Sequence, residues 1–382
     1  MAKTAGSYTY WGITAEIMSW VMLALIVTIA VIAPSACDNS QSSDDTDLLP
    51  QGTEISAVLA DVGPIVVIPA LERFRQSVET LQAGFEAWAA ASANGEAADT
   101  ERASVQEAFF ATMVIWQEIE VHQVGPSLDR RDEVYSFPTI NPCRIDQETT
   151  EVAWNDSNFY TDNNVNSYGL DAIEHLLFAP EENACPNQVN PNKDGSWDAL
   201  GAEGVRTYRA QFGAALAKGL LNEADFLLNA WKADGENFSA ALANAGDNAP
   251  YESELKGLNA VYDAIFYLET DAKDRKLALP MSLRDCDGDD CADEVEGFAS
   301  GQSIRWIEAN VKGFWSLYTG GTGMGMDDLL TDLGHGDLAA EFEAAYNDAI
   351  SVLASMTGRL DDIIRNDPES SEAIYNALKG LT

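Results

Sequence analysis

The stretch 168–178 constrains the fold most, because it is an apolar helical pattern whose charged groups share one face. At helical spacing, Asp171, Glu174 and His175 fall at positions i, i+3 and i+4, beside a stripe of leucine and isoleucine residues. A mostly apolar helix is normally buried. Burying two carboxylates and an imidazole is costly unless they pair, form hydrogen bonds or bind a cation. The fold must therefore either expose this face or give it a partner.

The rest of the chain is also helical in pattern, and no alternating strand pattern of useful length occurs in the sequence. We therefore predict an all-α body over 57–382, with two bundle-like halves of about 57–197 and 198–382. Pro64 and Pro69 should bend or restart the first helix. The expected helices are about 57–91, 100–124, 202–243, 252–276, 337–364 and 371–381.

One acidic residue falls on the apolar stripe of the second expected helix. The stripe recurs at steps of four and three residues and consists of Phe109, Met113, Trp116, Glu120 and Val124. Glu120 is thus a further candidate for burial, and it needs a cation, a nearby arginine or a backbone amide. Arg144 is the candidate counter-charge for the buried acids. Glu118 and His122 lie on another side of this helix, and we expect them to form a solvated pair.

The N-terminal residues 1–36 are typical of an export signal and not of a folded domain. Residues 17–33 form an uncharged apolar run, and small residues then lead directly to Cys37. This pattern resembles the lipobox of a bacterial lipoprotein, in which Cys37 would be acylated. An uncleaved signal anchor is the alternative, because the run is close to the lower limit of roughly 17 residues for a spanning helix. Residues 37–56 follow as a polar, disordered tether. Both readings place the body outside the cytoplasm, in the periplasm or at the cell surface.

The charge of the chain excludes some partners. With 62 acidic and 22 basic residues, the formal net charge is -40. Such a chain is not expected to bind nucleic acid or to dock electrostatically on anionic lipid. The acidic residues are spread along the sequence, which indicates a solvated surface. They would still attract cations.

The cysteines also favour export. Apart from Cys37 the sequence has an even number of them, as expected in an oxidising compartment. Cys143, Cys185, Cys286 and Cys291 allow three connectivities, of which the simplest joins the first two and the last two. These bonds would pin the long loops. A metal-thiolate site is less expected, because the sequence has no Cys-x-x-Cys pair.

A second acidic stretch spans 285–296. Acidic side chains at its first, third, fifth, ninth and twelfth positions match the oxygen spacing of a calcium loop; they are Asp285, Asp287, Asp289, Asp293 and Glu296. The sixth position is Asp290 where a calcium loop has glycine, and a disulfide inside the loop would restrict it. An acidic disulfide hairpin is therefore the default, with calcium binding as the alternative.

Several segments resemble the imelysin family, also described as insulin-cleaving membrane proteases or imelysin-like lipoproteins. The family signature is Gly-x-His-x-x-Glu. Gly169 and Glu174 match it, whereas Asp171 stands at the histidine position and His175 follows the glutamate. The other similar segments are 67–74, 116–126, 135–146 and 298–320. The resemblance implies an imelysin-like helical fold.

The resemblance also implies a link to iron uptake, with iron-uptake components as partners, since members of the family are associated with iron regulation. A carboxylate site with one imidazole suits iron or manganese, whereas zinc more often has several histidine or cysteine ligands. The candidate ligands of such a site between helices are Glu120, Asp171, Glu174 and His175.

Two alternatives remain open. A metallopeptidase, the activity after which the family was named, needs an open metal position and a general base, and the chain has no His-Glu-x-x-His motif. The sequence identifies no catalytic residue, and we rank an enzyme below a binding protein. Alternatively, Asp171 and Glu174 have only a structural role, because the dipole of a helix that begins near Gly169 favours anions in its first turn.

Overall fold

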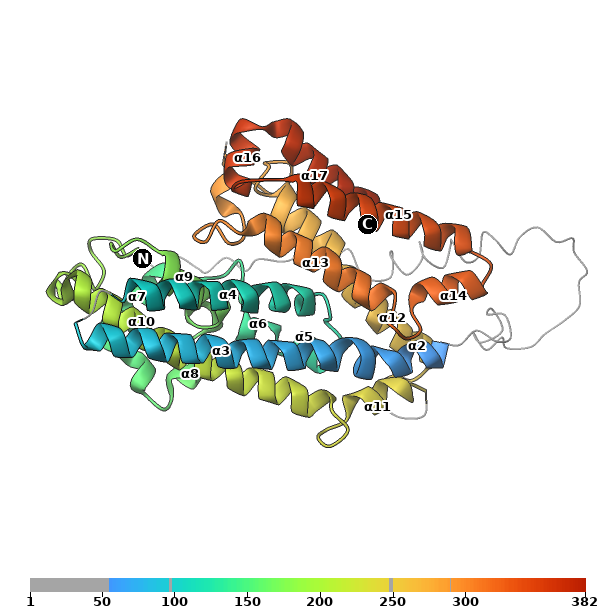
Figure 1. The fold of residues 1–382 in the computed structure, drawn as a ribbon, viewed down its shortest axis with the longest axis horizontal. Helices are drawn as coiled ribbons and strands as arrows, with labels where there is room; N and C mark the ends of the chain where they lie inside the picture. The colour runs from blue at the N-terminus through green and yellow to red at the C-terminus, as the bar shows by residue number, and fades with distance from the viewer. Residues whose placement is uncertain (1–54, 96–97, 247–249, 289) are drawn as a thin grey trace, which may run out of the picture. The chain divides into compact units, whose positions relative to one another are not determined.

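The computed structural model describes residues 55–95, 98–246, 250–288 and 290–382, and Figure 1 shows their helices. Within these ranges the chain forms helices and no β-strand, so the all-α prediction is confirmed. The predicted export signal, Cys37 and nearly all of the predicted tether lie outside the described residues.

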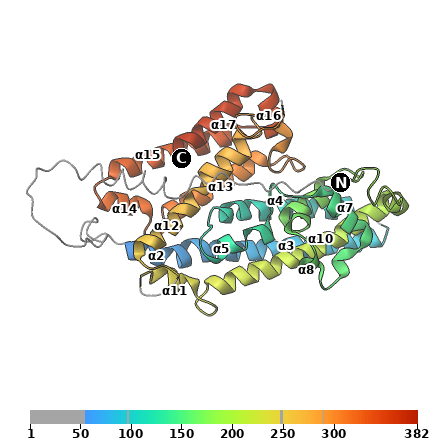
Figure 2. The same ribbon diagram turned by 180° about the vertical axis from the view of Figure 1, so that it is seen from behind.

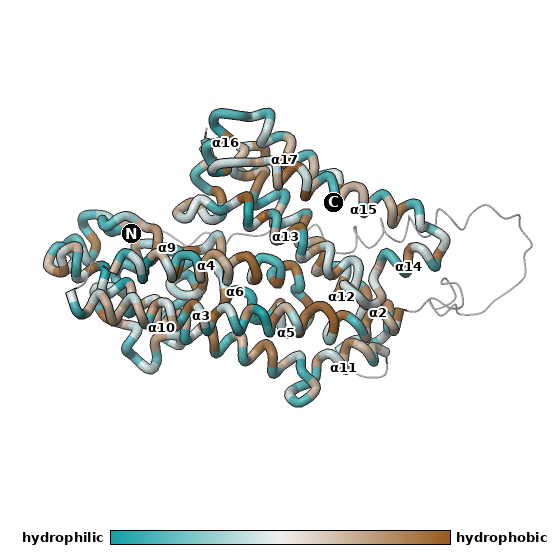
Figure 3. Tube along the Cα trace, in the orientation of Figure 1, coloured by the Kyte–Doolittle hydropathy of each residue, from teal (hydrophilic) through white to brown (hydrophobic). Residues whose placement is uncertain are grey.

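The longest helices pack side by side in one group. Helix α3 (Ile68–Ala93) packs against α4 (Asp99–Glu120) and against α10 (Ser196–Trp231). Large apolar side chains fill the space between them, each worth about 1.5–3 kcal/mol when fully buried; they include Phe74, Phe85, Trp88, Phe109, Trp116 and Phe212. Hydrophobic and hydrophilic residues alternate along these helices (Figure 3), as expected for helices with one buried face.

The first helix is interrupted near Pro64 and Pro69, as predicted from the sequence. α2 (Ile55–Asp61) passes through the π-helical segment η2 (Val62–Val67) into α3, and Pro69 lies in the first turn of α3, where a proline is tolerated. The continuous helix Ile55–Ala93 is apolar and long enough to cross a membrane by length and composition, and its most apolar window has a mean hydropathy of 1.8. Half of its most apolar window is buried within the fold. We interpret it as a core helix because it packs against α4 and α10.

The second group of helices contains η5, α13, α15 and α17. α13 packs against η5 and α15, and α17 packs against η5, α15 and α16. The helical elements of this part of the chain, from residue 254 onward, are α12 (Glu254–Ile265), η5 (Leu268–Ala278), η6 (Ala292–Glu294), α13 (Ser303–Tyr318), α14 (Met326–Asp332), α15 (Gly336–Ser355), α16 (Leu360–Asn366) and α17 (Pro368–Leu381). The two groups meet where α13 packs against α4.

Some predicted helix bounds were too long. The pattern over 202–243 forms α10 and a separate α11 (Phe238–Ala243), and the pattern over 252–276 forms α12 and the π-helical η5. Seen from behind in Figure 2, α10 follows α3, and α11 lies beside α2. The predicted boundary between bundles at 197–198 thus falls at the start of a helix that packs against α3 of the first group.

The segment 125–167 is more ordered than its sequence suggests. It folds into α5 (Pro126–Asp129), α6 (Arg131–Val134), α7 (Pro142–Glu151), η3 (Ala153–Asn155), α8 (Phe159–Asp162) and η4 (Val165–Ser167), and it leads into α9 (Leu170–Phe178). Both predicted disulfides are confirmed, Cys143–Cys185 and Cys286–Cys291. The first joins α7 to the loop after α9, so it holds together the segments on either side of α9, the helix that contains the signature residue Glu174.

Helices α4 and α13 approach each other closely at Gly313. A Cβ atom at this position would lie 2.2 Å from the backbone oxygen of Glu118. His122, 1% exposed, places Nε2 3.2 Å from the Gly313 oxygen, and burial lowers its pKa to about 4. Glu118 instead pairs with Arg73 at 2.8 Å. The predicted solvated pair of Glu118 and His122 is therefore wrong, because α13 covers the histidine.

The substitution Gly313→Ala is expected to lower the free energy of unfolding by about 1–3 kcal/mol, because the added methyl group must push two backbones apart. Urea denaturation measures this loss. Gly380→Ala in α17 is the matched control, since a Cβ atom there has no neighbour within 4 Å among the described residues. Equal effects of the two substitutions would contradict the close approach of α4 and α13.

Candidate functional site

Buried ionisable side chains from several helices gather around Tyr135. Burial raises the pKa of this tyrosine well above the usual value, and the carboxyl groups of Glu296, Glu174, Glu120 and Asp171 raise it further. Each of these carboxylates is at most 7% exposed. We call the group the buried polar centre; it consists of Glu120, Asp171, Glu174, Glu296, Arg131, Lys276 and Tyr135.

Lys276 supplies the positive charge on one side of the buried polar centre. The lysine is 1% exposed, and its ammonium lies among four oxygen atoms. Their distances from Nζ are 2.6 Å to Gln117 Oε1, 3.1 Å to Glu120 Oε2, 2.9 Å to Glu296 Oε1 and 2.9 Å to Asn310 Oδ1. An ammonium has three protons to donate, so these four oxygen atoms engage all of its hydrogen-bonding capacity. Lys276 thus occupies a place where a bound cation could otherwise lie.

Glu120 is fully engaged by cations. Its Oε1 accepts a hydrogen bond of 3.0 Å from Arg131 Nη2, and its Oε2 accepts from Lys276. Burial alone would raise the pKa of Glu120, but the charges of Lys276 and Arg131 outweigh burial and hold its pKa below the usual value. Glu120 is therefore ionised at neutral pH. The sequence predicted that this acid, on an apolar stripe, is buried and has a partner. Its partners are Lys276 and Arg131.

Glu296 is only half engaged. Its Oε1 contacts Lys276 and accepts a hydrogen bond from Gln117, whereas its buried Oε2 has no hydrogen-bond partner among the described residues. Burial raises the pKa of Glu296, and the charge of Lys276 offsets only part of this effect. The Tyr135 hydroxyl also acts on this carboxyl and lowers its pKa, but no hydrogen bond of normal geometry reaches Oε2 in the described part of the chain.

Asp171 and Glu174 are held by uncharged donors. Ser136 Oγ donates to Asp171 Oδ2 at 2.6 Å, and the backbone N–H of Ser300 donates to Glu174 Oε1 at 2.9 Å. No lysine or arginine forms an ion pair with either carboxylate in the described part of the chain. Burial raises the pKa of each to about 7. These two groups therefore change protonation near neutral pH.

The signature glycine positions these carboxylates. Gly169 precedes α9 with φ of 91°, a backbone conformation that favours glycine. A Cβ atom there would lie 2.8 Å from the backbone oxygen of Val134. The close contact lets α9 begin against the segment that carries Tyr135 and Ser136, which brings Ser136 to Asp171 in the first turn of α9.

His175 lies in a different environment from the other predicted metal ligands. Its Nε2 is 3.0 Å from Asp146 Oδ1, and Arg209 Nη2 is 3.7 Å from the same oxygen. Arg144, the predicted counter-charge, pairs with Glu148 one turn away on α7 and donates to Asn163 at 3.0 Å. The counter-charges of Glu120 are instead Arg131 and Lys276, whereas Arg144 is engaged by Glu148 on its own helix.

The acidic stretch 285–296 does not gather its carboxylates around one point. Glu296 lies in the core with Lys276, and Asp293 Oδ1 is 2.7 Å from Arg365 Nη2. Asp285 pairs with the neighbouring Arg284, and Asp289 lies outside the described residues. Two of the five predicted calcium ligands are thus engaged by cations from other helices.

The donors of the buried polar centre suit a hard cation, but their described positions do not form a complete metal site. Among the described residues, no three histidine, cysteine, aspartate or glutamate side chains lie close enough together to hold a metal ion. The centre nevertheless contains four carboxyl groups and only two cationic side chains. Two positive charges are needed for balance, and either two protons or one divalent cation would supply them.

The sequence analysis did not identify Lys276 and Asn310 as site residues, although each, like Glu120, is a polar residue on an apolar helical stripe. Leu268, Ala272 and Lys276 recur at steps of four, as do Trp306 and Asn310. Each polar residue therefore falls on an apolar helical stripe and is a candidate for burial. No pattern along the chain identifies Tyr135, which lies between short helices.

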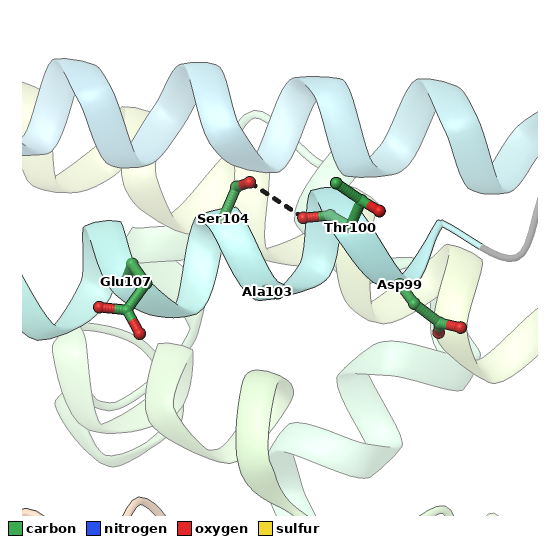
Figure 4. A pocket seen from close by; sticks show the side chains of 5 residues that line it. All are labelled: Asp99, Thr100, Ala103, Ser104 and Glu107. Atoms are coloured by element: carbon green, nitrogen blue, oxygen red, sulfur yellow. Dashed lines mark hydrogen bonds between the residues drawn. The ribbon is translucent and has the colours of Figure 1, made fainter.

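A hollow on the surface of α4 is a weaker candidate. Figure 4 shows its five lining residues, all from one exposed face of α4: Asp99, Thr100, Ala103, Ser104 and Glu107. The hydrogen bond drawn there, 2.9 Å from Ser104 Oγ to the Thr100 oxygen, is local to the helix. None of these side chains is buried, so nothing in the hollow is preorganised for a ligand.

Comparisons with known proteins identify a fold and a family. A sequence model of the family Imelysin, peptidase M75, matches residues 67–382. An imelysin-like protein from Psychrobacter arcticum has a TM-score of 0.65 and 14% identity, covering 87% of this chain and 93% of that one. A proposed iron-regulated protein A precursor from Parabacteroides distasonis has a TM-score of 0.66 and 14% identity, covering 89% and 97%. No curated protein matches the sequence. At this identity the two structures show a shared fold.

Proposed function

This chain belongs to the imelysin family, and on that basis we propose that it is an exported, membrane-tethered protein that binds a metal ion of the iron type in the buried polar centre. The observation that supports metal binding is the surplus of two buried carboxyl groups over cationic side chains. The similarity to a proposed iron-regulated protein supports a role in iron uptake. The two disulfides support an oxidising compartment, and the apolar run before Cys37 supports a lipid anchor or a signal anchor.

The proposed ligands are Asp171, Glu174 and Glu296. Two of them have pKa values near 7, and the third has an oxygen with no partner among the described residues. Carboxylate oxygens, with the phenol of Tyr135 nearby, suit iron or manganese better than zinc. Glu120 remains with Lys276 and Arg131, and His175 remains with Asp146. A cation that enters the centre would replace protons on Asp171 and Glu174, so a small shift of these side chains is part of the proposal.

The full chain, purified without metal and loaded with ferrous iron or manganese, is expected to retain bound metal at pH 8 and much less at pH 6. If two protons with pKa near 7 are displaced, the apparent affinity should differ roughly 100-fold between these pH values. Elemental analysis after gel filtration measures the bound metal. Glu174→Gln is expected to weaken binding by at least about tenfold, the equivalent of one lost charged contact.

The exposed Glu182 provides the matched control, since Glu182→Gln makes the same chemical change outside the centre. Thermal unfolding of each metal-free variant shows whether the fold is retained. A wild-type protein that retains no iron or manganese at pH 8 would contradict the proposal. The acids would then have a structural role, with Lys276 as their resident cation.

The family's description as a peptidase suggests a second candidate function, metal-dependent proteolysis. Hydrolysis would need a metal with an open position and a nearby general base. Within the ranges that the structure describes, no group of three suitable ligands exists. This absence bears equally on binding, so the order rests on the sequence, which has no His-Glu-x-x-His motif to place a general base beside a metal; binding is ranked first. Metal-dependent cleavage of an unfolded protein that is lost in Glu174→Gln would reverse this order.

A further inference from the structure

A second buried charged cluster lies at the C-terminal end of α9 and shares no side chain with the proposed metal ligands. Arg102 of α4 and Arg209 of α10 line a small cavity together with the apolar side chains of Trp88, Leu176 and Val205. Arg209 is 4% exposed. Two guanidinium groups from different helices thus face one interior space in a chain that is otherwise strongly acidic.

The known contacts of these arginines do not use all of their donors. Arg102 Nη2 donates to the Leu177 oxygen at 2.6 Å, and Arg209 Nη1 donates to the Ala179 oxygen at 3.0 Å, so both satisfy carbonyl groups at the end of α9. Arg102 Nε, Arg209 Nε and Arg209 Nη2 are buried and have no hydrogen-bond partner within the described ranges. Unsatisfied buried donors are rare and call for a ligand or water.

The charges around the cavity favour an anion. Arg206 and Glu181 also line the cavity, and Arg206 Nη1 lies 3.0 Å from Glu181 Oε1, so this largely exposed pair is neutral. Of the guanidinium groups of Arg102 and Arg209, only that of Arg209 forms an ion pair in the described part of the chain, with Asp146 Oδ1 at 3.7 Å from its Nη2. Burial lowers the pKa of Arg209, and the positive charge of Arg102 lowers it further. One positive charge is thus left without a counter-ion.

We propose that this cavity is a binding site for a small monovalent anion, chloride. Its volume of about 20 Å³ has room for one particle the size of a water molecule, which needs at least about 10–15 Å³. Phosphate, sulfate and organic acids are larger. A water molecule would also fit, but it is uncharged and would leave the remaining guanidinium charge without a counter-ion. A halide accepts from every free N–H and balances the charge.

Bromide replaces chloride and is located by its anomalous scattering. Crystals of the full chain in sodium bromide are expected to show an anomalous peak in the cavity, next to Arg102 and Arg209. A feature without anomalous signal, meaning water only, would overturn the proposal. This measurement needs no variant.

Thermal unfolding tests the same site in solution. The Tm of the full chain is expected to rise with chloride concentration, in a saturable manner, above the Tm in sodium gluconate at equal ionic strength. Arg209→Lys keeps the charge but removes the planar donor fork, and it should weaken the chloride effect by roughly tenfold or more. Arg305→Lys at an exposed position is the control and should leave the effect unchanged. Equal Tm values in chloride and gluconate would overturn the proposal.

Discussion

Replacing Lys276 with methionine is expected to lower the free energy of unfolding by roughly 3–5 kcal/mol, the usual cost of removing one partner from a buried ion pair. Methionine has nearly the same length as lysine, so the change removes the ammonium and little volume. Glu120 would keep Arg131, but Glu296 would lose its only cationic contact among the described residues. The side-chain amide oxygens of Gln117 and Asn310 would also each lose a hydrogen-bond donor, because both accept from Lys276. Urea denaturation at pH 8 measures the loss.

Two comparisons make this result specific. Lys312 is 46% exposed and pairs with Glu308 one turn away, so Lys312→Met should cost less than about 1 kcal/mol. Adding Glu296→Gln to Lys276→Met should restore part of the lost stability, because the uncompensated charge is removed together with its partner. If Lys276→Met were as mild as Lys312→Met, the ammonium would not be what makes these buried acids tolerable.

Metal-free protein is expected to lose several kcal/mol of stability as the pH rises from about 4 to about 7. Burial raises the pKa of Asp171 from 3.8, and of Glu174 from 4.5, to about 7 in the folded state. Between these values the folded protein holds protons that the unfolded chain has released, so stability falls as the pH rises and levels off above the folded-state pKa. Each unit of difference corresponds to about 1.4 kcal/mol. Unfolding free energies across this range, measured in a chelator, test the slope.

The double variant Asp171→Asn and Glu174→Gln isolates this contribution. Other groups also titrate, since Glu120 has a lowered pKa and opposes the trend, so the difference between wild type and variant is the relevant quantity. The variant is expected to have a flatter profile between pH 4 and 7. Changing the exposed Glu182 to glutamine should not alter the profile. Equal slopes of wild type and double variant over this range would contradict the assigned protonation.

The candidate site was predictable in part. The helical spacing that places Glu120 on an apolar stripe, and the polar face of the helix at 168–178, correctly identified acids that are buried. His122 and Arg144 were misplaced because their surroundings come from other segments. α13 covers His122, and α7 turns Arg144 toward Glu148.

The sequence by itself determined the helical class, the interruption of the first helix and the resemblance to the family, because periodicity, proline positions and short motifs are local properties of the chain. Cysteine parity allowed two disulfides but left three pairings open, and the structure decided between them. Only the tertiary structure decided what accompanies the buried acids. Lys276 is 156 residues from Glu120 along the chain, and Ser300 is 126 residues from Glu174. Such partners are brought together by helix packing, and so the charge balance of an interior cannot be read from any single helix.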